Sequence, residues 1–425
     1  MESGFRKIEL QYKKYGNVQG LMQYINKDTL LKQHRKQLGN KATGIDKITK
    51  YDYQRNINDN IDKLLTNMKT MSYKPKAVRR TYIPKVGSNE LRPLGIPAYE
   101  DKIVQGAMAE ILRNIYENIF LDCSYGFRSN RDCHKALKEL DRIIMWENVN
   151  YIVDADIKGF FNNVNHEWLI KFLEYTIKDK TFIRYISRFL KAGIMEDMQQ
   201  CESDKGTPQG GLISPILANV YLHYVLDLWF GKVVKAQCKG KAFLIRYADD
   251  FVCCFQYKSE AEKFYKALKE RTSKFDLQLA EDKSKIIPFG RNTKSKETFE
   301  FLGFTHRNGK SRKGLYKLIH HTSAKKSRAK KESVKQWLKE KVYIYPTPYL
   351  IKKLNIKLVG MYRYYGISDN VQWMIKFRQY VRYELKKWLS RRSQKGYITW
   401  EKYNKILQYN PIATPKIYHS LWQFE

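Results

Sequence analysis

The chain of 425 residues is long enough for two or three domains, and its apolar content of 43% can build sizeable cores. Lysine and arginine number 79 against 43 acidic residues, and the formal net charge of +36 favours a nucleic-acid partner over an anionic membrane surface. The N-terminal stretch lacks the apolar core of a secretory signal, and no apolar run predicts a membrane span. The six cysteines form no CxxC pair, so we expect neither a zinc site nor a disulfide framework, and a reducing cytoplasm fits best.

Turn residues and apolar periodicity predict mixed helices and strands as far as residue 305. Helices are predicted at about 5–40 and 53–68, after Pro97, at about 165–193, after a Gly/Pro loop within 206–230, and at about 258–273. Strands are predicted at 78–83 with a short return through Leu91, at 151–161, as a strand–turn–strand over 244–255, and at 299–307. The character of the chain then changes, because residues 305–341 hold 13 lysines and arginines against two glutamates. We therefore predict an α+β domain, followed by a basic helical domain whose boundary lies near 305–325.

Two pairs of carboxylates stand out in this basic chain. Asp154 and Asp156 lie at the end of the apolar strand start in "YIVDADIKGFF", while Asp249 and Asp250 occupy the turn in "LIRYADDFVCCF". If the two strands are neighbours in one sheet, Asp156 and Asp249 converge, and such mutually repelling carboxylates suit Mg²⁺. Two ions about 4 Å apart would form a phosphoryl-transfer centre. The alternative is that these are scattered surface aspartates, and spacing alone leaves it open.

Ordered sequence blocks resemble the reverse transcriptase family, and within it the bacterial group II intron-encoded reverse transcriptase/maturases. The blocks are "GIDKIT", "RRTYIPKVGSNELRPLGIPAYEDKIVQ", "SYGFRSNRDCHKAL", "DIKGFFNNVNH", "TPQGGLISPILAN", "RYADDFV", "LAEDKSK" and "FEFLGF", which cover about residues 41–305. Further on, "LVGMYRYYGIS" resembles the maturase (X) region of that family.

The resemblance implies an α+β, right-hand polymerase. Fingers and palm would take residues 1–305, with an N-terminal helical extension over about 1–50. A basic α-helical thumb/maturase (X) domain would take 306–391, and the short region 392–425 has no assigned role.

The same resemblance implies roles for individual residues. Asp156, Asp249 and Asp250 would be catalytic, with Asp156, Asp249 and the backbone of Ile157 as metal ligands, whereas Asp154 is expected to be structural. Nucleotide contacts are implied for Arg80, Lys85, Arg92, Phe161, Gln209 and Lys283; the Phe161 ring would exclude a 2′-hydroxyl, and Lys283 would protonate the leaving pyrophosphate. Leu302 and Gly303 resemble the turn that grips the primer. Lys325, Lys326, Arg328, Lys330 and Lys331 are predicted to contact RNA or template, although each cation also fits an ordinary surface position.

The expected function is RNA-directed DNA polymerisation with two Mg²⁺ ions, or Mn²⁺ in their place. The expected partners are an RNA template, a DNA or RNA primer, dNTPs and group II intron RNA, whose splicing and mobility the protein would assist in the bacterial cytoplasm. The oligomeric state is left open. A free-standing relative serving phage defence, repair or CRISPR adaptation is an alternative, and a non-polymerising RNA-binding splicing factor is a weaker one.

Three features of the sequence do not follow from the family pattern. The frequent "FFD" of the family reads Phe160-Phe161-Asn162 here, which we do not expect to abolish activity. No HNH-like endonuclease follows the helical region, so mobility that needs its own endonuclease is in doubt. His320 and His321 are expected to face solvent or RNA rather than to bind a metal.

Overall fold

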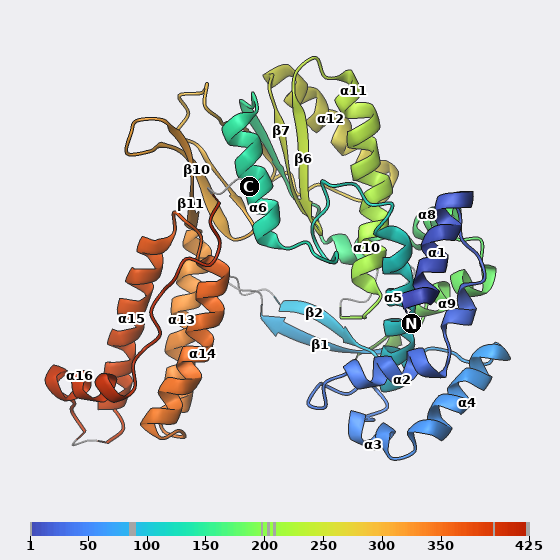
Figure 1. Ribbon diagram of the computed structural model, residues 1–425, viewed down its shortest axis with the longest axis horizontal. Coiled ribbons are helices and arrows are strands. Elements are labelled where there is room, and N and C mark those ends of the chain that lie inside the picture. Colours follow the sequence, from blue (N-terminus) through green and yellow to red (C-terminus); the bar gives the residue numbers. More distant parts are fainter. Residues whose placement is uncertain are drawn as a thin grey trace. The chain divides into compact units, whose positions relative to one another are not determined.

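The computed structural model describes residues 2–84, 91–196, 199–201, 205–206, 210–393 and 396–421. Its chain divides into two compact units (Figure 1). The first contains the described residues of 1–84, 90–136 and 151–286, and the second contains those of 137–150 and 287–425. The mixture of helices and sheets confirms the predicted α+β class.

The first unit is built mainly from helices around two small sheets. Its helices are α1 (Glu2–Tyr15), η1 (Leu21–Tyr24), α2 (Lys27–Lys36), α3 (Lys50–Gln54), α4 (Ile57–Lys69), α5 (Tyr99–Tyr116), α7 (Phe160–Asn163), α8 (His166–Thr176), α9 (Lys180–Leu190), α10 (Ser214–Leu222), η2 (His223–Asp227), η3 (Phe230–Val234), α11 (Lys235–Gln237) and α12 (Lys258–Lys274). Its strands are β1 (Val78–Pro84), β2 (Leu91–Ile96), β3 (Tyr151–Ala155), β4 (Ile194–Glu196), β5 (Gln199–Cys201), β6 (Ala242–Tyr247) and β7 (Asp250–Phe255). Helix α6 (Cys133–Trp146) and strand β8 (Lys285–Pro288) cross from one unit to the other.

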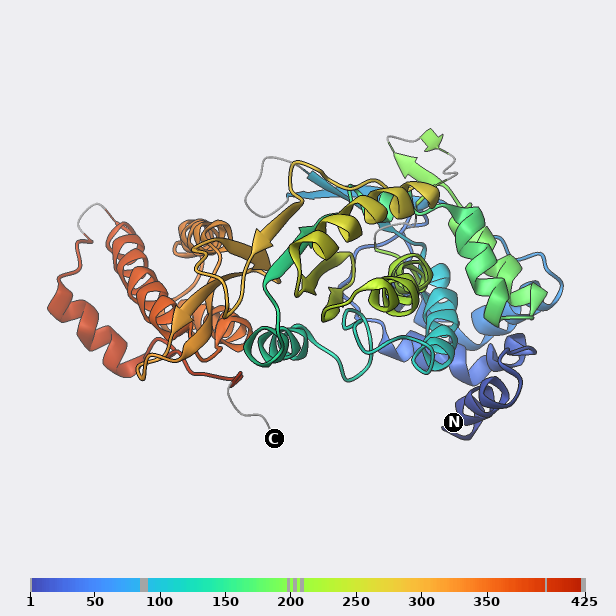
Figure 2. The ribbon, with the colours of Figure 1, turned by 90° about the horizontal axis from the view of Figure 1, so that it is seen from above.

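The sheet that carries the conspicuous aspartates has the strand order β6-β7-β3-β8. Strand β7 pairs antiparallel with both β6 and β3, so it is central. Phe251 to Phe255 are all buried, and helix α12 packs across one face of this sheet (Figure 2). Phe255 meets Phe264 of α12 with ring centroids 5.1 Å apart. A continuous apolar run is what a strand covered on both faces requires, and Cys253 and Cys254 are core residues, as predicted.

A second sheet of the first unit has the order β2-β1-β4-β5. Strands β1 and β2 form an antiparallel ribbon, and β1 pairs parallel with β4. Some helices of the first unit begin at side-chain caps. Asp179, for example, accepts a hydrogen bond from the backbone N–H of Phe182 at the start of α9 and one from Leu21 at the start of η1, so one carboxylate fixes the entry of two helices.

The second unit combines a small sheet with a helical bundle. Its elements are β9 (Thr298–Phe301), β10 (Phe304–Lys310), β11 (Tyr316–Thr322), α13 (Ala324–Lys341), α14 (Thr347–Tyr365), α15 (Val371–Ser390) and α16 (Trp400–Tyr409). The strand order is β11-β10-β9, and α13, α14 and α15 lie side by side in Figure 1. The buried Tyr403 of α16 donates its hydroxyl proton to the carbonyl of Arg382 in α15, so the region after residue 391 packs as part of this bundle.

Several expectations differ from the structure. The predicted helix over 53–68 is two helices, α3 and α4, and the strand-like stretch 299–307 is a hairpin that turns at Leu302-Gly303. The basic stretch after 305 begins with two strands, β10 and β11, of which β11 was not predicted. The predicted boundary after residue 305 falls within β10 of the second unit.

The expectation that His320 faces solvent or RNA is wrong. Its side chain is fully buried, with Nε2 3.0 Å from Asp141 Oδ1 and Nδ1 2.8 Å from Nδ1 of the buried His306. A paired carboxylate and a second imidazole satisfy this histidine inside the unit, because buried polar groups need partners.

Candidate active site

The turn between β6 and β7 places the Asp249–Asp250 pair. Tyr247 pairs with Asp250 across the hairpin, so Ala248 and Asp249 form a two-residue loop. Ala248 has φ 59°, in the left-handed region that a residue with a Cβ rarely adopts. Asp249 is half-buried and Asp250 is exposed. The loop is therefore short and strained, and it points one carboxylate inward.

Asp156 reaches the same place from strand β3. The β3–β7 register pairs Ala155 with Phe251, which puts the end of β3 beside the start of β7. The backbone of Asp156 is fixed by the segment just before β8, because its carbonyl accepts from the N–H of Ala280 at 2.8 Å and its N–H donates to Ser284 Oγ at 3.3 Å. The predicted convergence of Asp156 and Asp249 requires that their two strands be neighbours in one sheet. In the structure β3 and β7 are such neighbours.

The two carboxylates repel one another. Burial raises the pKa of Asp249, and the negative charge of Asp156 raises that pKa further, while the guanidinium groups of Arg92 and Arg246 lower it. Lys283 Nζ lies 3.8 Å from Asp156 Oδ2, but both side chains are about half exposed or more, so water screens this pair. The site therefore carries unbalanced negative charge.

A divalent cation fits this charge, with two carboxylates and the adjacent backbone of the buried Ile157 as hard oxygen donors. Within the described parts of the chain, no group of three or more His, Cys, Asp or Glu side chains could hold a metal ion. The protein can thus supply only part of a coordination sphere here, and the remaining positions suit water and the oxygens of a phosphate substrate.

Of the predicted nucleotide contacts that the structure describes, Arg92 and Lys283 interact with these carboxylates. Arg92 in β2 is exposed and favours the ionised form of Asp249. In the β1–β2 register Arg80 pairs with Gly95 and Ile83 with Arg92, so the alternation of side chains points Arg80 and Arg92 to opposite faces of the ribbon. Lys85 and Gln209 lie outside the described residues.

Gly210 lies against strand β2, and Gly206 lies against the backbone at Phe161. A Cβ added to Gly210 would lie 2.5 Å from the carbonyl oxygen of Gly95, and one added to Gly206 would lie 3.0 Å from that of Phe161. Glycine is needed at both positions because backbones pass so closely. Phe161 is half-buried, and its ring stands edge-on to the buried Phe160 with centroids 5.4 Å apart. Gly210 thus adjoins strand β2, and Gly206 adjoins the backbone of the segment that carries Phe161.

The predicted primer and RNA contacts belong to the second unit. Leu302 and Gly303, with φ 51° and 79°, form the β9–β10 turn, and Tyr364 Oη donates to the Leu302 carbonyl at 2.8 Å. The basic residues are on α13, which begins right after Ser323, whose N–H donates to the Gly303 carbonyl at 3.0 Å. These are Lys325, Lys326, Arg328, Lys330 and Lys331. A Cβ on Gly303 would lie 3.7 Å from Lys326 Cγ, so the turn and the start of the basic helix adjoin.

Sequence reasoning missed the groups that hold the β6–β7 turn. Arg246 is fully buried, yet in the sequence it is one more cation of a basic chain. Its Nε and Nη2 bind both oxygens of the buried Asp227, at 2.7 and 2.5 Å. The available signal was its position inside an apolar strand, where a charge is tolerated only with a partner.

Part of the chain matches a known protein family. Residues 83–306 match the family model described as reverse transcriptase (RNA-dependent DNA polymerase). The chain belongs to the reverse transcriptase family. These enzymes copy RNA templates and generally use divalent metal ions, in keeping with the charge of the carboxylate pair.

Individual relatives confirm the resemblance to group II intron proteins. Over 174 residues, 40% of this chain and 29% of the relative, the chain is 45% identical to group II intron-encoded protein LtrA of Lactococcus lactis subsp. cremoris. Over 324 residues, 68% of this chain and 82% of the relative, it is 30% identical to protein YkfC of Escherichia coli K12. Over 165 residues, 39% of this chain and 20% of the relative, it is 38% identical to a 91 kDa protein in the cob intron of Schizosaccharomyces pombe. The match thus spans less than a third of LtrA.

Among solved structures, the chain is similar to telomerase from Candida albicans in complex with a TWJ fragment of telomeric RNA. The TM-score is 0.45 at 11% identity, with 85% of this chain and 65% of that chain covered. This likeness carries no argument about the present chain. Across the described residues, no helix has the length and apolar character needed to cross a membrane.

Proposed function

We propose that this protein is an RNA-directed DNA polymerase that extends a primer 3′-hydroxyl with dNTPs along an RNA template. The observation that carries the proposal is the meeting of Asp156 and Asp249 at the end of β3 and the β6–β7 turn, in a chain of the reverse transcriptase family. The fold holds the Asp156 and Asp249 carboxylates together, and the pKa of Asp249 is raised. A bound cation would offset the repulsion between them.

The residues divide the work of one phosphoryl transfer. Asp156, Asp249 and the Ile157 carbonyl would hold two Mg²⁺ ions, or Mn²⁺, which when bound make the 3′-hydroxyl a better nucleophile and stabilise charge on the leaving group. The 3′-hydroxyl loses its proton to solvent water, its oxygen bonds to the α-phosphorus, and the bond from that phosphorus to pyrophosphate breaks. Lys283 Nζ, beside Asp156, donates a proton to that pyrophosphate.

The other predicted residues select and bind the substrates. Arg92 neutralises triphosphate charge, and Arg80, Lys85 and Gln209 are further proposed contacts. The Phe161 ring would collide with a 2′-hydroxyl and so favour dNTPs. Asp250 supports the turn. Leu302, Gly303 and the basic residues of α13 would hold the primer terminus and the RNA, as parts of a thumb/maturase domain assigned to residues 306–391.

A second role, binding group II intron RNA to assist its splicing and mobility in the bacterial cytoplasm, is supported by the relatives that are named as intron-encoded proteins. The alternative is a free-standing enzyme of this type. The sequence that flanks the gene distinguishes the two alternatives, because the gene of an intron protein lies within the sequence of a structured catalytic RNA. We leave the number of subunits open.

Primer extension on an RNA template with dNTPs and Mg²⁺ tests the proposed activity. Replacing both Asp249→Ala and Asp250→Ala should reduce extension by at least about 10³-fold, because groups that act as a catalytic unit cause losses of that size. RNA binding, measured by fluorescence anisotropy, should remain nearly unchanged because neither carboxylate attracts a polyanion.

The matched control is Asp62→Ala, which removes a carboxylate from a solvent-exposed ion pair with Lys27 and should leave extension unaltered. Extension that survives the double substitution would exclude the assigned site. An inactive wild-type protein that still binds RNA would instead support a non-polymerising RNA-binding factor.

A further inference from the structure

The loop that contains "SYGFR" has no role in the proposed reaction, yet it lies directly against the strained β6–β7 turn. Ser124 forms a parallel bridge with Arg246, whose N–H donates to the Cys123 carbonyl at 2.8 Å. The Arg246 carbonyl accepts from the N–H of Tyr125, also at 2.8 Å. The loop thus fixes the backbone of β6 two residues before Ala248.

Arg246 connects this loop to the turn through its side chain. Its Nη1 donates to the carbonyl of Ala248 at 2.9 Å and to Asn219 Oδ1 at 2.9 Å, and its Nη2 donates to Ser124 Oγ at 2.8 Å. The Asp227 carboxylate neutralises the guanidinium, and both side chains are 0% exposed. The rigid, planar guanidinium group of Arg246 therefore fixes the position of the turn relative to helix α10, η2 and the loop.

The loop also touches the turn by backbone packing. A Cβ built on Gly126 would lie only 2.3 Å from the backbone nitrogen of Ala248. Asn219, which receives one Arg246 hydrogen bond, donates its own Nδ2 to the Gly126 carbonyl at 2.6 Å. A glycine is required here because the loop approaches the turn more closely than any side chain allows.

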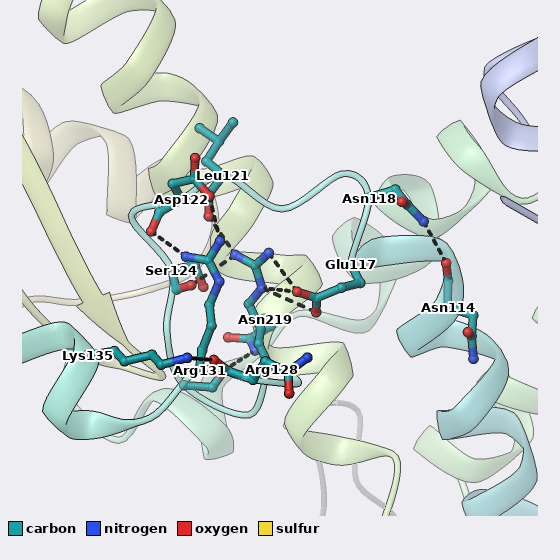
Figure 3. Close-up of polar contacts among 12 residues, drawn as sticks. Asn114, Glu117, Asn118, Leu121, Asp122, Ser124, Arg128, Arg131, Lys135 and Asn219 are labelled. Atoms are coloured by element: carbon teal, nitrogen blue, oxygen red, sulfur yellow. Dashed lines mark hydrogen bonds and ion pairs between the residues drawn. The ribbon is translucent and has the colours of Figure 1, made fainter. Parts of the chain in front are cut away.

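A second arginine holds the loop from behind (Figure 3). Arg128 Nη1 donates to the carbonyls of Leu121 and Ser124, at 2.7 and 2.9 Å, and its Nε and Nη2 reach Glu117 Oε1 at 3.2 and 3.0 Å. Glu117 directly follows α5. The Arg128 side chain is 3% exposed, so its hydrogen bond to the Ser124 carbonyl is shielded from water.

We propose that the segment Leu121–Arg128 is a support that positions the Ala248–Asp249 turn, and with it the Asp249 carboxylate, for metal binding. The segment acts through Gly126 and the Arg246 guanidinium, and its residues are positioning rather than catalytic residues. The inference rests on the proposed function. A two-residue loop with left-handed Ala248 holds its shape only if its surroundings enforce it, and outer groups that orient metal ligands strongly affect metal affinity.

Gly126→Ala is the sharpest test, since the added methyl must displace the turn by roughly 1 Å, a misplacement that can cost about 10²-fold in rate. Mn²⁺ binding to the full-length protein is measured by electron paramagnetic resonance without nucleotide, and primer extension is measured against Mg²⁺ concentration. We expect Mn²⁺ affinity about 10- to 100-fold weaker, a higher Mg²⁺ requirement, and unchanged RNA binding. Ser124→Ala, which removes one hydrogen bond to Arg246, should shift both metal readouts in the same direction by less.

Two control variants carry comparable changes nearby. Gly231→Ala adds a methyl on an exposed helical residue whose nearest neighbour is a flexible Leu121 methyl at 3.4 Å. Lys135→Ala removes a cation whose amine donates to the carbonyl of Asn130 at 2.6 Å, outside the segment Leu121–Arg128 (Figure 3). Both should keep wild-type metal responses.

If the segment Leu121–Arg128 only supports folding, Gly126→Ala should reduce the amount of folded protein and leave its metal dependence at the wild-type level. That result would overturn the proposal. If Gly126→Ala does not fold, Ser124→Ala decides, and wild-type Mn²⁺ affinity in that variant overturns it. If the wild-type protein extends no primer, the proposed polymerase function fails, while weaker Mn²⁺ binding by Gly126→Ala would still support the positioning role.

Discussion

Asp249 combines three conditions that each oppose stability at neutral pH. Its carboxylate is half-buried, it faces the charge of Asp156, and it follows a residue in left-handed conformation. Burial and repulsion both favour the protonated acid, so the pKa in the folded protein lies above its value in the unfolded chain. Ionisation of Asp249 therefore destabilises the fold, by an amount that is absent at acid pH and grows as pH rises through the folded pKa.

Replacing Asp249→Asn should consequently stabilise the metal-free protein while abolishing primer extension. We expect a melting temperature about 1–3 °C higher at pH 7.5, with the difference shrinking as the pH is lowered toward 4, because Asp249 then becomes protonated in the wild type. Thermal unfolding in EDTA across this pH range measures the effect. Added Mg²⁺ should narrow the gap, since a ligand of the native state stabilises only the protein that binds it.

The control for this experiment is Asp62→Asn, which alters a carboxylate exposed to solvent and should change stability by less than about 0.5 kcal/mol. A lower melting temperature for Asp249→Asn at pH 7.5 would contradict the view that the ionised carboxylate is held at a cost.

At the scale of elements, two tight hairpin turns share one feature. The β6–β7 turn holds Ala248 with φ 59°, and the β9–β10 turn holds Leu302 with φ 51°. Asn, Asp and Gly adopt this conformation more easily than Ala or Leu. Strain of this kind persists where a side chain is needed for another reason, although Lys47 shows that it also occurs away from the proposed site.

Leu302→Asn should thus make the protein more stable and a weaker polymerase. Relief of the left-handed strain should add about 0.5–1 kcal/mol to the free energy of unfolding, while loss of the apolar side chain should raise the KM for primer–template. Denaturant unfolding and steady-state extension measure the two effects. In the control Lys47→Asn, which relieves similar strain at an exposed residue with φ 56°, stability should rise with KM unchanged. An unchanged KM for Leu302→Asn would remove this turn from the primer site.

The strands and the acidic turn could be predicted from sequence because their signals are local. Phe251–Phe255 is a continuous apolar run beside a turn, which favours a strand covered on both faces. The support of the turn could not be predicted, because Arg246 meets partners 19, 27 and 122 residues away in the chain. His320 failed for the same reason, since the carboxylate that satisfies it is 179 residues distant. Roles inferred from the family for Lys85 and Gln209 stay predictions.

At the scale of the whole molecule, the formal net charge of +36 predicts that nucleic-acid binding depends steeply on salt. Charge on this scale attracts RNA anywhere on the surface, so the useful question is which cations contact phosphates. Helix α13 is the strongest candidate, because Lys325 and Arg328 are exposed near its start, next to the β9–β10 turn.

Replacing Lys325→Ala together with Arg328→Ala should weaken binding of a labelled RNA–DNA primer–template and flatten its salt dependence. Each lost phosphate contact should reduce the slope of log Kd against log salt concentration by about 1, so the double variant should lose about 2. Lys263→Ala with Lys266→Ala removes the same charge from exposed positions on α12 and should leave the slope unchanged. Equal losses in both variants would mean that general attraction to net charge, rather than contact by α13, governs binding, because a change in the overall field does not depend on which helix supplies the charge.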